Sequence, residues 1–145
     1  MSSIPFTDRE LMRAWRDLSA IATPGGGSSR TNPHRLLLFY AVECGLKAVW
    51  LKRHSRSLFD HEEISRTGHN LRLVLKELRV GTQLSLPVNL QLSAVTRNQV
   101  QVQRSGDIGI LHQAWRYGGE CTGPTDAQCE QQLQQVLNWI QGELK

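Results

Sequence analysis

The segment ILHQAWRYGG, residues 110–119, carries two side chains suited to RNA chemistry, four residues apart. His112 can act as a general acid or base near neutral pH, and Arg116 can bind a phosphate or stabilise a negatively charged transition state. At a spacing of four residues on a helix, both side chains lie on the same side. We therefore predict His112 and Arg116 as the catalytic pair, acting on one partner.

A structural interpretation competes with catalysis, and it starts from a carboxylate in the most apolar segment. One helical stripe of that segment consists of Leu36, Tyr40, Glu43, Lys47 and Trp50. A carboxylate among apolar neighbours needs a partner, because burying an unpaired charge is costly. Lys47 is one candidate partner of Glu43, and an Arg or His from another helix is the other. A Glu43–Arg116 pair would make the arginine structural, whereas binding of RNA or nucleotide phosphate without turnover is a third interpretation.

The cysteines and histidines do not show the spacing of a metal site. Cys44 lies in an apolar run, and Cys121 and Cys129 are too far apart in sequence for a zinc knuckle. We expect reduced structural thiols, no metal and no cofactor. The formal charge of +4 is compatible with a nucleic acid or another anion as partner.

Length and hydropathy indicate one globular domain over residues 1–145. No run approaches the roughly 18 to 20 apolar residues that a membrane span needs. The first ten residues have neither the basic region nor the apolar region of a secretory signal. We therefore expect a cytoplasmic protein without a membrane partner.

Capping residues and hydrophobic periodicity predict five helices. They are expected over residues 8–22, 33–54, 70–80, 107–118 and 125–144. Capping boxes begin the first helix, with Thr7 and Glu10, and the last, with Thr125 and Gln128. The other expected N-caps are Asn32, Asn70, and either Ser105 or Asp107, and Gly81 is the expected terminator of the third helix. A flexible loop is expected over 24–32 and a charged loop over 55–68, with a short turn of helix around Leu58 to Ile64.

Alternating hydrophobicity predicts a β-hairpin insertion over residues 84–103. Apolar residues alternate with polar ones before and after a polar turn at residues 94–98. A short helix after Pro87 is the competing prediction. The expected fold class is mainly α: an up-and-down bundle of four to five helices with this insertion. Gly45 in the second helix would permit close approach of another helix.

Three motifs in order resemble the HEPN superfamily, the higher-eukaryote and prokaryote nucleotide-binding helical domains. They are AVECGLKA (41–48), GHNL (68–71) and the Arg-Tyr that ends LHQAWRY (111–117), and the similarity covers residues 32–144. The resemblance implies a helical bundle that forms homodimers through its core helices. It also implies binding roles for Glu43, Lys47, His69, Arg116 and Tyr117.

HEPN ribonucleases carry an Arg, then four to six residues, then a His on the late helix, and this chain departs from that pattern. Arg104 precedes His112 by seven intervening residues, and Arg116 follows it. Three classes of function therefore remain. The first is an interaction module of an antiviral defence or toxin–antitoxin system that binds RNA or nucleotide. The second is a metal-independent ribonuclease with a rearranged His/Arg site, and the third is a structural subunit that binds a protein partner in a larger complex.

Overall fold

The computed structural model describes residues 4–26, 29–60, 62, 67–81 and 84–145. Its helices are α1 (Asp8–Ala22), α2 (Asn32–Arg53), α4 (Leu71–Leu78), α5 (Ile110–Arg116) and α6 (Asp126–Glu143). Its strands are β1 (Phe6–Thr7), β2 (Leu58–Phe59), β3 (Leu90–Arg97), β4 (Val100–Gly106) and β5 (Cys121–Gly123). The fold is predominantly helical, as predicted, but two small antiparallel sheets distinguish it from a simple up-and-down bundle.

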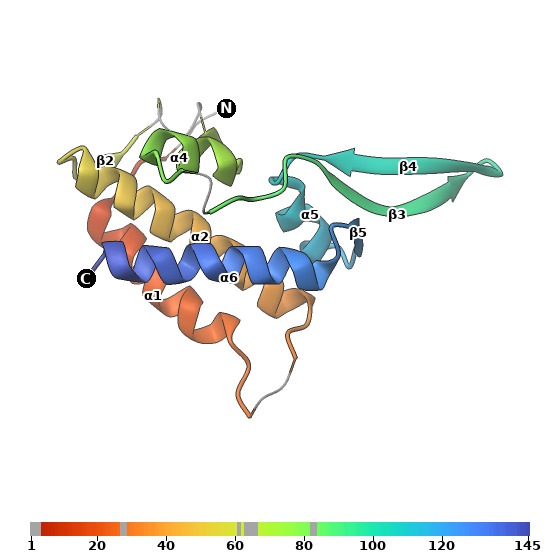
Figure 1. Cartoon of the computed structure of the whole chain (residues 1–145), viewed down its shortest axis with the longest axis horizontal. Coiled ribbons are helices and arrows are strands. Elements are labelled where there is room, and N and C mark those ends of the chain that lie inside the picture. Colours follow the sequence, from red (N-terminus) through yellow and green to blue (C-terminus); the bar gives the residue numbers. More distant parts are fainter. Residues whose placement is uncertain (1–3, 27–28, 61, 63–66, 82–83) are drawn as a thin grey trace.

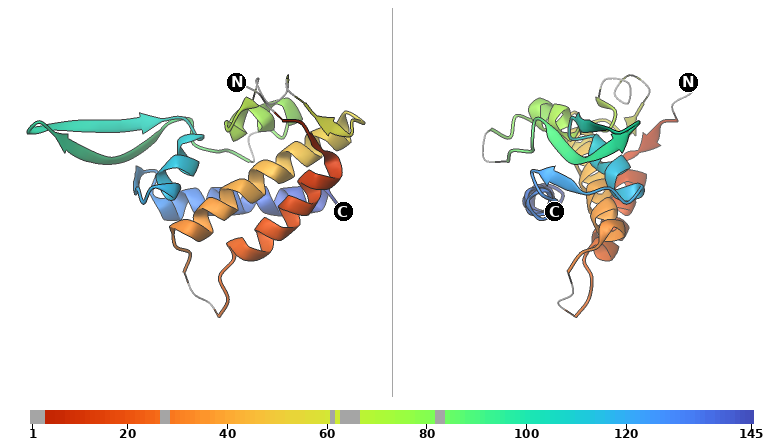
Figure 2. Two further views of the ribbon diagram at one scale, coloured as in Figure 1. Left: turned by 180° about the vertical axis from the view of Figure 1, so that it is seen from behind. Right: turned by 90° about the vertical axis from the view of Figure 1, so that its right-hand side faces the viewer.

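Helix α2 is the centre of the hydrophobic core. It contacts α1, α4, α5 and α6 (Figures 1 and 2). Its fully buried side chains include Leu38, Phe39, Val42, Leu46 and Leu51. A helix that is apolar nearly all round must be enclosed by other elements, so this arrangement follows from the composition of residues 36–51.

The close helix approach predicted at Gly45 is confirmed. A Cβ atom at this position would lie 2.8 Å from Cγ2 of Ile140 on α6 and 2.9 Å from Cδ1 of Trp15 on α1. Both distances are too short for real carbon contacts, so α1 and α6 pack where the side chain is missing.

Capping residues set most helix ends as predicted. Thr7 and Thr125 form capping boxes with Glu10 and Gln128. Asn70 caps α4 by accepting a hydrogen bond from the backbone N–H of Arg72, at 3.1 Å. The expected N-cap of α2 was wrong by one position, because Thr31 caps the helix and Asn32 is its first helical residue.

Two helices are shorter than predicted. Helix α4 ends at Leu78 rather than 80, with Arg79 as a left-handed cap at φ 54°, and Gly81 follows outside the helix. Helix α5 covers 110–116 rather than 107–118, and its N-cap is Gly109. Ser105, one expected cap, belongs to β4. The carboxylate of Asp107, the other expected cap, accepts from the Gly109 N–H at 2.8 Å before the helix begins.

The hairpin insertion is confirmed, with shifted bounds. Strands β3 and β4 pair over 90–106, so residues 84–89 lie before the hairpin. The competing prediction of a short helix after Pro87 is wrong. The register shifts between Leu92 and Val95. Strand β5 pairs with β3 at the base of the hairpin, and the sequence pattern did not predict this third strand. The distal hairpin extends away from the helices (Figures 1 and 2).

A second, two-stranded sheet was also not predicted. Phe6 pairs with Phe59 and Thr7 with Leu58, which joins the start of α1 to the segment after α2. Leu58 and Phe59 are therefore extended rather than helical. The rest of the predicted turn of helix lies mostly outside the described residues.

Asp126 fixes α5 against α6. Its Oδ1 atom accepts from Nε1 of Trp115 at 2.9 Å and from the backbone N–H of Cys121 at 3.2 Å. Its Oδ2 atom lies 3.7 Å from Nη1 of Arg35 on α2. One carboxylate therefore joins α2, α5, β5 and α6, and it holds α5 in the position from which His112 and Arg116 project. Within the described residues, no helix is both long and apolar enough to cross a membrane.

Candidate active site

Glu43 holds His69 in place from inside the core. Oε2 of Glu43 lies 2.8 Å from Nδ1 of His69, the second residue before α4, and 3.6 Å from Nζ of Lys47. Glu43 is only 7% exposed, whereas half of the His69 side chain is exposed. Both kinds of partner considered for the carboxylate, the lysine one turn along and a histidine from another element, are therefore present.

The two ionisable partners shift each other's pKa in opposite directions. Burial raises the pKa of Glu43, but the hydrogen bond from His69 and the charge of Lys47 outweigh burial, so the net pKa is lowered. The hydrogen bond to Glu43 raises the pKa of His69 above its ordinary value of 6.5, against desolvation. The arrangement therefore favours a carboxylate that faces a protonated imidazole.

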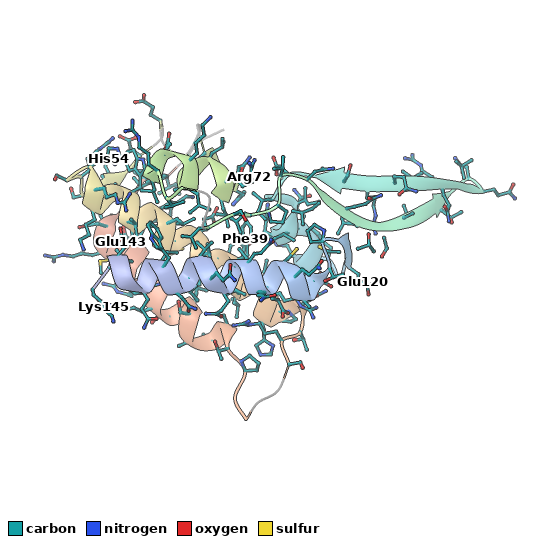
Figure 3. The ribbon with its side chains drawn as sticks, in the orientation of Figure 1. Phe39, His54, Arg72, Glu120, Glu143 and Lys145 are labelled. Atoms are coloured by element: carbon teal, nitrogen blue, oxygen red, sulfur yellow. The ribbon has the colours of Figure 1, made fainter. Side chains whose placement is uncertain are left out.

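A second imidazole, that of His112, lies beside the first. The ring centroids of His69 and His112 are 4.2 Å apart, with the planes inclined at 38°. On its other side His112 lies near the rings of Phe39 and Tyr40, at 6.0 and 6.4 Å. Figure 3 shows Phe39 at the centre of the molecule, where α2 and α5 meet.

The environment of His112 favours its neutral form. Its Nδ1 atom is buried and has no hydrogen-bond partner among the described residues. Desolvation lowers its pKa below 6.5, and the nearby charges of His69 and Arg116 lower it further. The pKa values of the two adjacent imidazoles are thus shifted in opposite directions, which is the arrangement that an acid–base pair needs.

Arg116 does not pair with Glu43, so that structural prediction was wrong. The guanidinium instead donates to the hydroxyl of Tyr40, which lies one turn before Glu43 on α2. The hydrogen bonds to Tyr40 and Tyr117 raise the pKa of Arg116 above its ordinary value. Its guanidinium carbon lies 6.0 Å from the ring centroid of Tyr117, which is 77% exposed. Arg116 is therefore held at the surface by the two tyrosines, near the imidazoles of His69 and His112.

His69 and His112 share a shallow hollow at the surface. Its volume is about 280 Å³, and the rest of its lining comes from Thr67, Asn70, Asp107, Gly109, Ile110 and Gln113. These residues belong to the loop before α4, the segment before α5 and the first turn of α5. The structure thus brings together Glu43, Lys47, His69 and His112, with Arg116 nearby on α5 and bonded to Tyr40, whereas Tyr117 is exposed to solvent.

The pairing of His69 with His112 was not predicted from the sequence. The two residues are 43 positions apart, so no local period connects them. His69 was predicted as a site residue only through the resemblance to HEPN proteins. Tyr40 was placed on the correct stripe of α2 but was not predicted as the partner of Arg116. The sequence feature that could have identified Tyr40 as this partner is its position one turn before Glu43, on the face of α2 that α5 covers.

The cysteines lie outside this site. Cys44, Cys121 and Cys129 are unpaired thiols, and burial raises the pKa of Cys44 to about 11, which makes it a poor nucleophile at neutral pH. Among the residues that the structure describes, no group of three or more His, Cys, Asp or Glu side chains is arranged to hold a metal ion. The ionisable side chains that line the hollow are those of His69, Asp107 and His112.

Comparison of the chain with protein-family models, curated proteins and solved structures finds no match. The resemblance to HEPN proteins therefore rests on the three sequence motifs.

Proposed function

We propose that the protein is a HEPN-like RNA-binding domain whose paired histidines cleave RNA without a metal ion. The observation that carries the proposal is the contact between His69 and His112, two imidazoles with opposite pKa shifts at one surface hollow. Acid–base catalysis is most efficient when the two groups hold opposite protonation states near the working pH. The flanking arginine supplies the positive charge that a phosphodiester attracts.

In the proposed reaction, neutral His112 accepts the proton of a ribose 2′-hydroxyl, and the oxygen attacks the adjacent phosphorus. Protonated His69 donates its proton to the departing 5′-oxygen as the P–O bond breaks. The products are a 2′,3′-cyclic phosphate and a 5′-hydroxyl, and the two histidines have exchanged protonation states. Proton transfer through solvent restores them.

The neighbouring side chains support these two roles. Glu43 orients His69 and raises its pKa, which favours the protonated imidazole. Arg116, on the same helix as His112, can neutralise the charge that develops on the phosphorane oxygens. Lys47 is bound to Glu43 and offsets part of the negative charge below the hollow.

The proposal is tested by incubating the protein with a fluorescent RNA oligonucleotide in EDTA and identifying the products. A 2′,3′-cyclic phosphate is expected from the wild-type chain. His112→Asn and His69→Asn should each lower the rate roughly 100-fold or more, because each removes one proton-transfer group.

His34→Gln is the matched control. It removes an imidazole at the start of α2, where the His34 ring accepts from the Thr31 N–H at 3.2 Å, and glutamine can take over this capping role. The control should cleave at the wild-type rate. Melting temperatures of all variants show whether a loss is catalytic, and wild-type protein that leaves RNA intact in EDTA would refute ribonuclease activity.

The HEPN resemblance extends the proposal to antiviral defence or toxin–antitoxin function. A toxin that degrades RNA should arrest growth when it is expressed alone. We expect His112→Asn to abolish such arrest, and equal toxicity of wild type and variant would argue against an RNA-cleaving role in the cell.

A homodimer is the second proposal, and the hairpin supports it. Strand β4 lies at the edge of its sheet, and the stretch 98–103 carries no charge or proline that would block pairing with another strand. Two copies of β4 paired antiparallel about Val102 would place Arg104 opposite Val100, so no like charges would meet. Val100 and Val102 are 63% and 39% exposed. Because four other helices contact α2, the hairpin offers a more open interface than the core helices.

A further inference from the structure

A row of positively charged side chains leads away from the hollow along α4. Arg72 and Lys76 lie four residues apart on one side of α4, and Arg79, the left-handed C-cap of the helix, follows three residues later. Arg72 lies three residues after His69, and the helical part of the row, from Arg72 to Lys76, extends about 6 Å at the rise of 1.5 Å per residue. Figure 3 places Arg72 at the end of α4 nearest the base of the hairpin.

The three cations have no ion-pair partner among the described residues. Cations one turn apart repel each other by roughly 0.2–0.5 kcal/mol, so the stripe does not stabilise the helix. Glu77, the acidic residue of α4, lies about 100° around the axis from Lys76 and has an interaction of its own. The stripe therefore presents unneutralised positive charge beside the site.

A hollow of about 780 Å³ borders the stripe on the side of α2. Lys76, Glu77 and Arg79 line it together with Trp50, His54 and Leu73. The His54 ring stacks on Trp50 at 4.0 Å between centroids, and Leu73 is 40% exposed. Positive charge next to aromatic and apolar surface is the combination that binds single-stranded nucleic acid, through phosphates and bases respectively.

We propose that α4 binds the stretch of single-stranded RNA that flanks the cleaved bond. Arg72, Lys76 and Arg79 hold successive phosphates, and nearby bases lie against Leu73 and His54. The scissile phosphodiester lies in the hollow of His69 and His112. This inference rests on the proposed function, because the path of the RNA along α4 is taken to start at the proposed catalytic histidines.

The test is a triple substitution, Arg72→Gln, Lys76→Gln and Arg79→Gln. Its matched control is Arg9→Gln, Arg13→Gln and Arg16→Gln on α1, which changes the net charge by the same amount on the other side of α2 (Figure 1). Glutamine is a good helix former, so both variants should fold, and circular dichroism verifies this. The probes are a 12-nucleotide 2′-O-methyl RNA for binding and the dinucleotide UpA for cleavage.

The α4 variant should bind the 12-mer roughly tenfold more weakly, and the slope of log K against log salt should fall by about 2, at 0.7 per lost phosphate contact. Its kcat/KM for UpA should fall much less than its affinity for the 12-mer, since a dinucleotide in the hollow reaches at most Arg72, the first residue of the stripe. The α1 control should retain the affinity and salt slope of the wild type. Equal losses in both variants, or no loss in the α4 variant, would overturn the inference.

The outcomes separate this inference from the proposed function. If the wild type fails to cleave UpA while the α4 variant still loses 12-mer affinity, the RNA surface stands and catalysis by the histidines fails. If the wild type cleaves UpA and the α4 variant binds the 12-mer normally, catalysis by the histidines stands and the RNA surface on α4 is wrong. If the stripe binds poly-glutamate but not the 12-mer, its partner is an acidic protein and the RNA inference is wrong.

Discussion

Glu43 is the side chain on which the geometry of the candidate site depends. A buried carboxylate must be paired, and the fold supplies Lys47 from the same helix and His69 from another segment. The contact that pairs the buried carboxylate therefore also orients the His69 imidazole and raises its pKa. Glu43 is therefore a positioning residue, which acts on substrate only through His69.

Glu43→Gln tests this role. Glutamine retains a hydrogen-bonding oxygen but not the charge, so the pKa of His69 should fall towards 6.5, as NMR titration of the imidazole protons would show. The basic limb of any cleavage profile should move to lower pH in parallel. An unchanged His69 titration would show that the carboxylate does not set its protonation.

The same substitution has a predictable effect on stability. A lowered Glu43 pKa stabilises the fold above the unfolded value of 4.5, and this contribution is lost as the pH falls through the folded value. A raised His69 pKa stabilises below 6.5, and its contribution is lost as the pH rises through the folded value. The free energy of unfolding of Glu43→Gln should therefore fall most between pH 4.5 and 6.5, by about 1–3 kcal/mol. Urea denaturation across this range measures it.

Prediction at individual residues succeeded where the interaction was local. The Thr7 and Thr125 capping boxes span three residues, and the Glu43–Lys47 pair spans four. The partner of Arg116 could not be inferred in the same way, because it depends on the angle at which α5 crosses α2. That angle places the guanidinium one turn away from Glu43, at Tyr40.

Among the elements, the packing of α1 and α6 on α2 depends on the missing side chain of Gly45. Helix periodicity predicted both outer helices almost to the residue, at 8–22 and 125–144. Strands β1, β2 and β5 have two or three residues each, too few for a period to be visible. They form because tertiary contacts bring their partner strands close, which local sequence does not encode.

Gly45→Ala should destabilise the protein although alanine is the better helix former. The added methyl group would overlap Ile140 and Trp15, and overpacking of this kind costs about 1–3 kcal/mol. Gly142→Ala in α6 is the control, because its Cβ would meet nothing within 4 Å. The control should gain about 0.5–1 kcal/mol from helix propensity. Thermal unfolding distinguishes the two, and equal stabilisation by both would show that α2 is not closely packed at Gly45.

The whole molecule combines a compact helical body with a protruding hairpin (Figure 1). The insertion was visible in the sequence from its alternating pattern, although its base was placed six residues too early. Leu84, Leu86 and Val88 continue the alternation without joining a strand, since the register of β3 begins at Leu90. The direction in which the hairpin extends could not be predicted from the sequence, because α5 and β5 set it.

Val100→Lys with Val102→Lys tests the hairpin as a dimer interface. Lysine on an edge strand opposes pairing with a second copy, whereas Val100→Thr with Val102→Thr keeps a β-forming, neutral edge. Sedimentation velocity should show a wild-type dimer, a monomeric lysine variant and a dimeric threonine variant. Melting temperatures should differ little, since substitutions at exposed positions cost about 0.5 kcal/mol or less. A wild-type monomer at every concentration would refute the dimer.

The pH dependence of RNA cleavage bears most directly on the two histidines. With UpA in EDTA under single-turnover conditions, the rate should rise with pH through a pKa below 6.5, as His112 becomes neutral. It should fall again through a pKa above 6.5, as His69 loses its proton. His112→Asn should remove the acidic limb and His69→Asn the basic limb. A rate that increases continuously with pH, or a bell-shaped profile that survives both substitutions, would contradict the proposed catalytic pair.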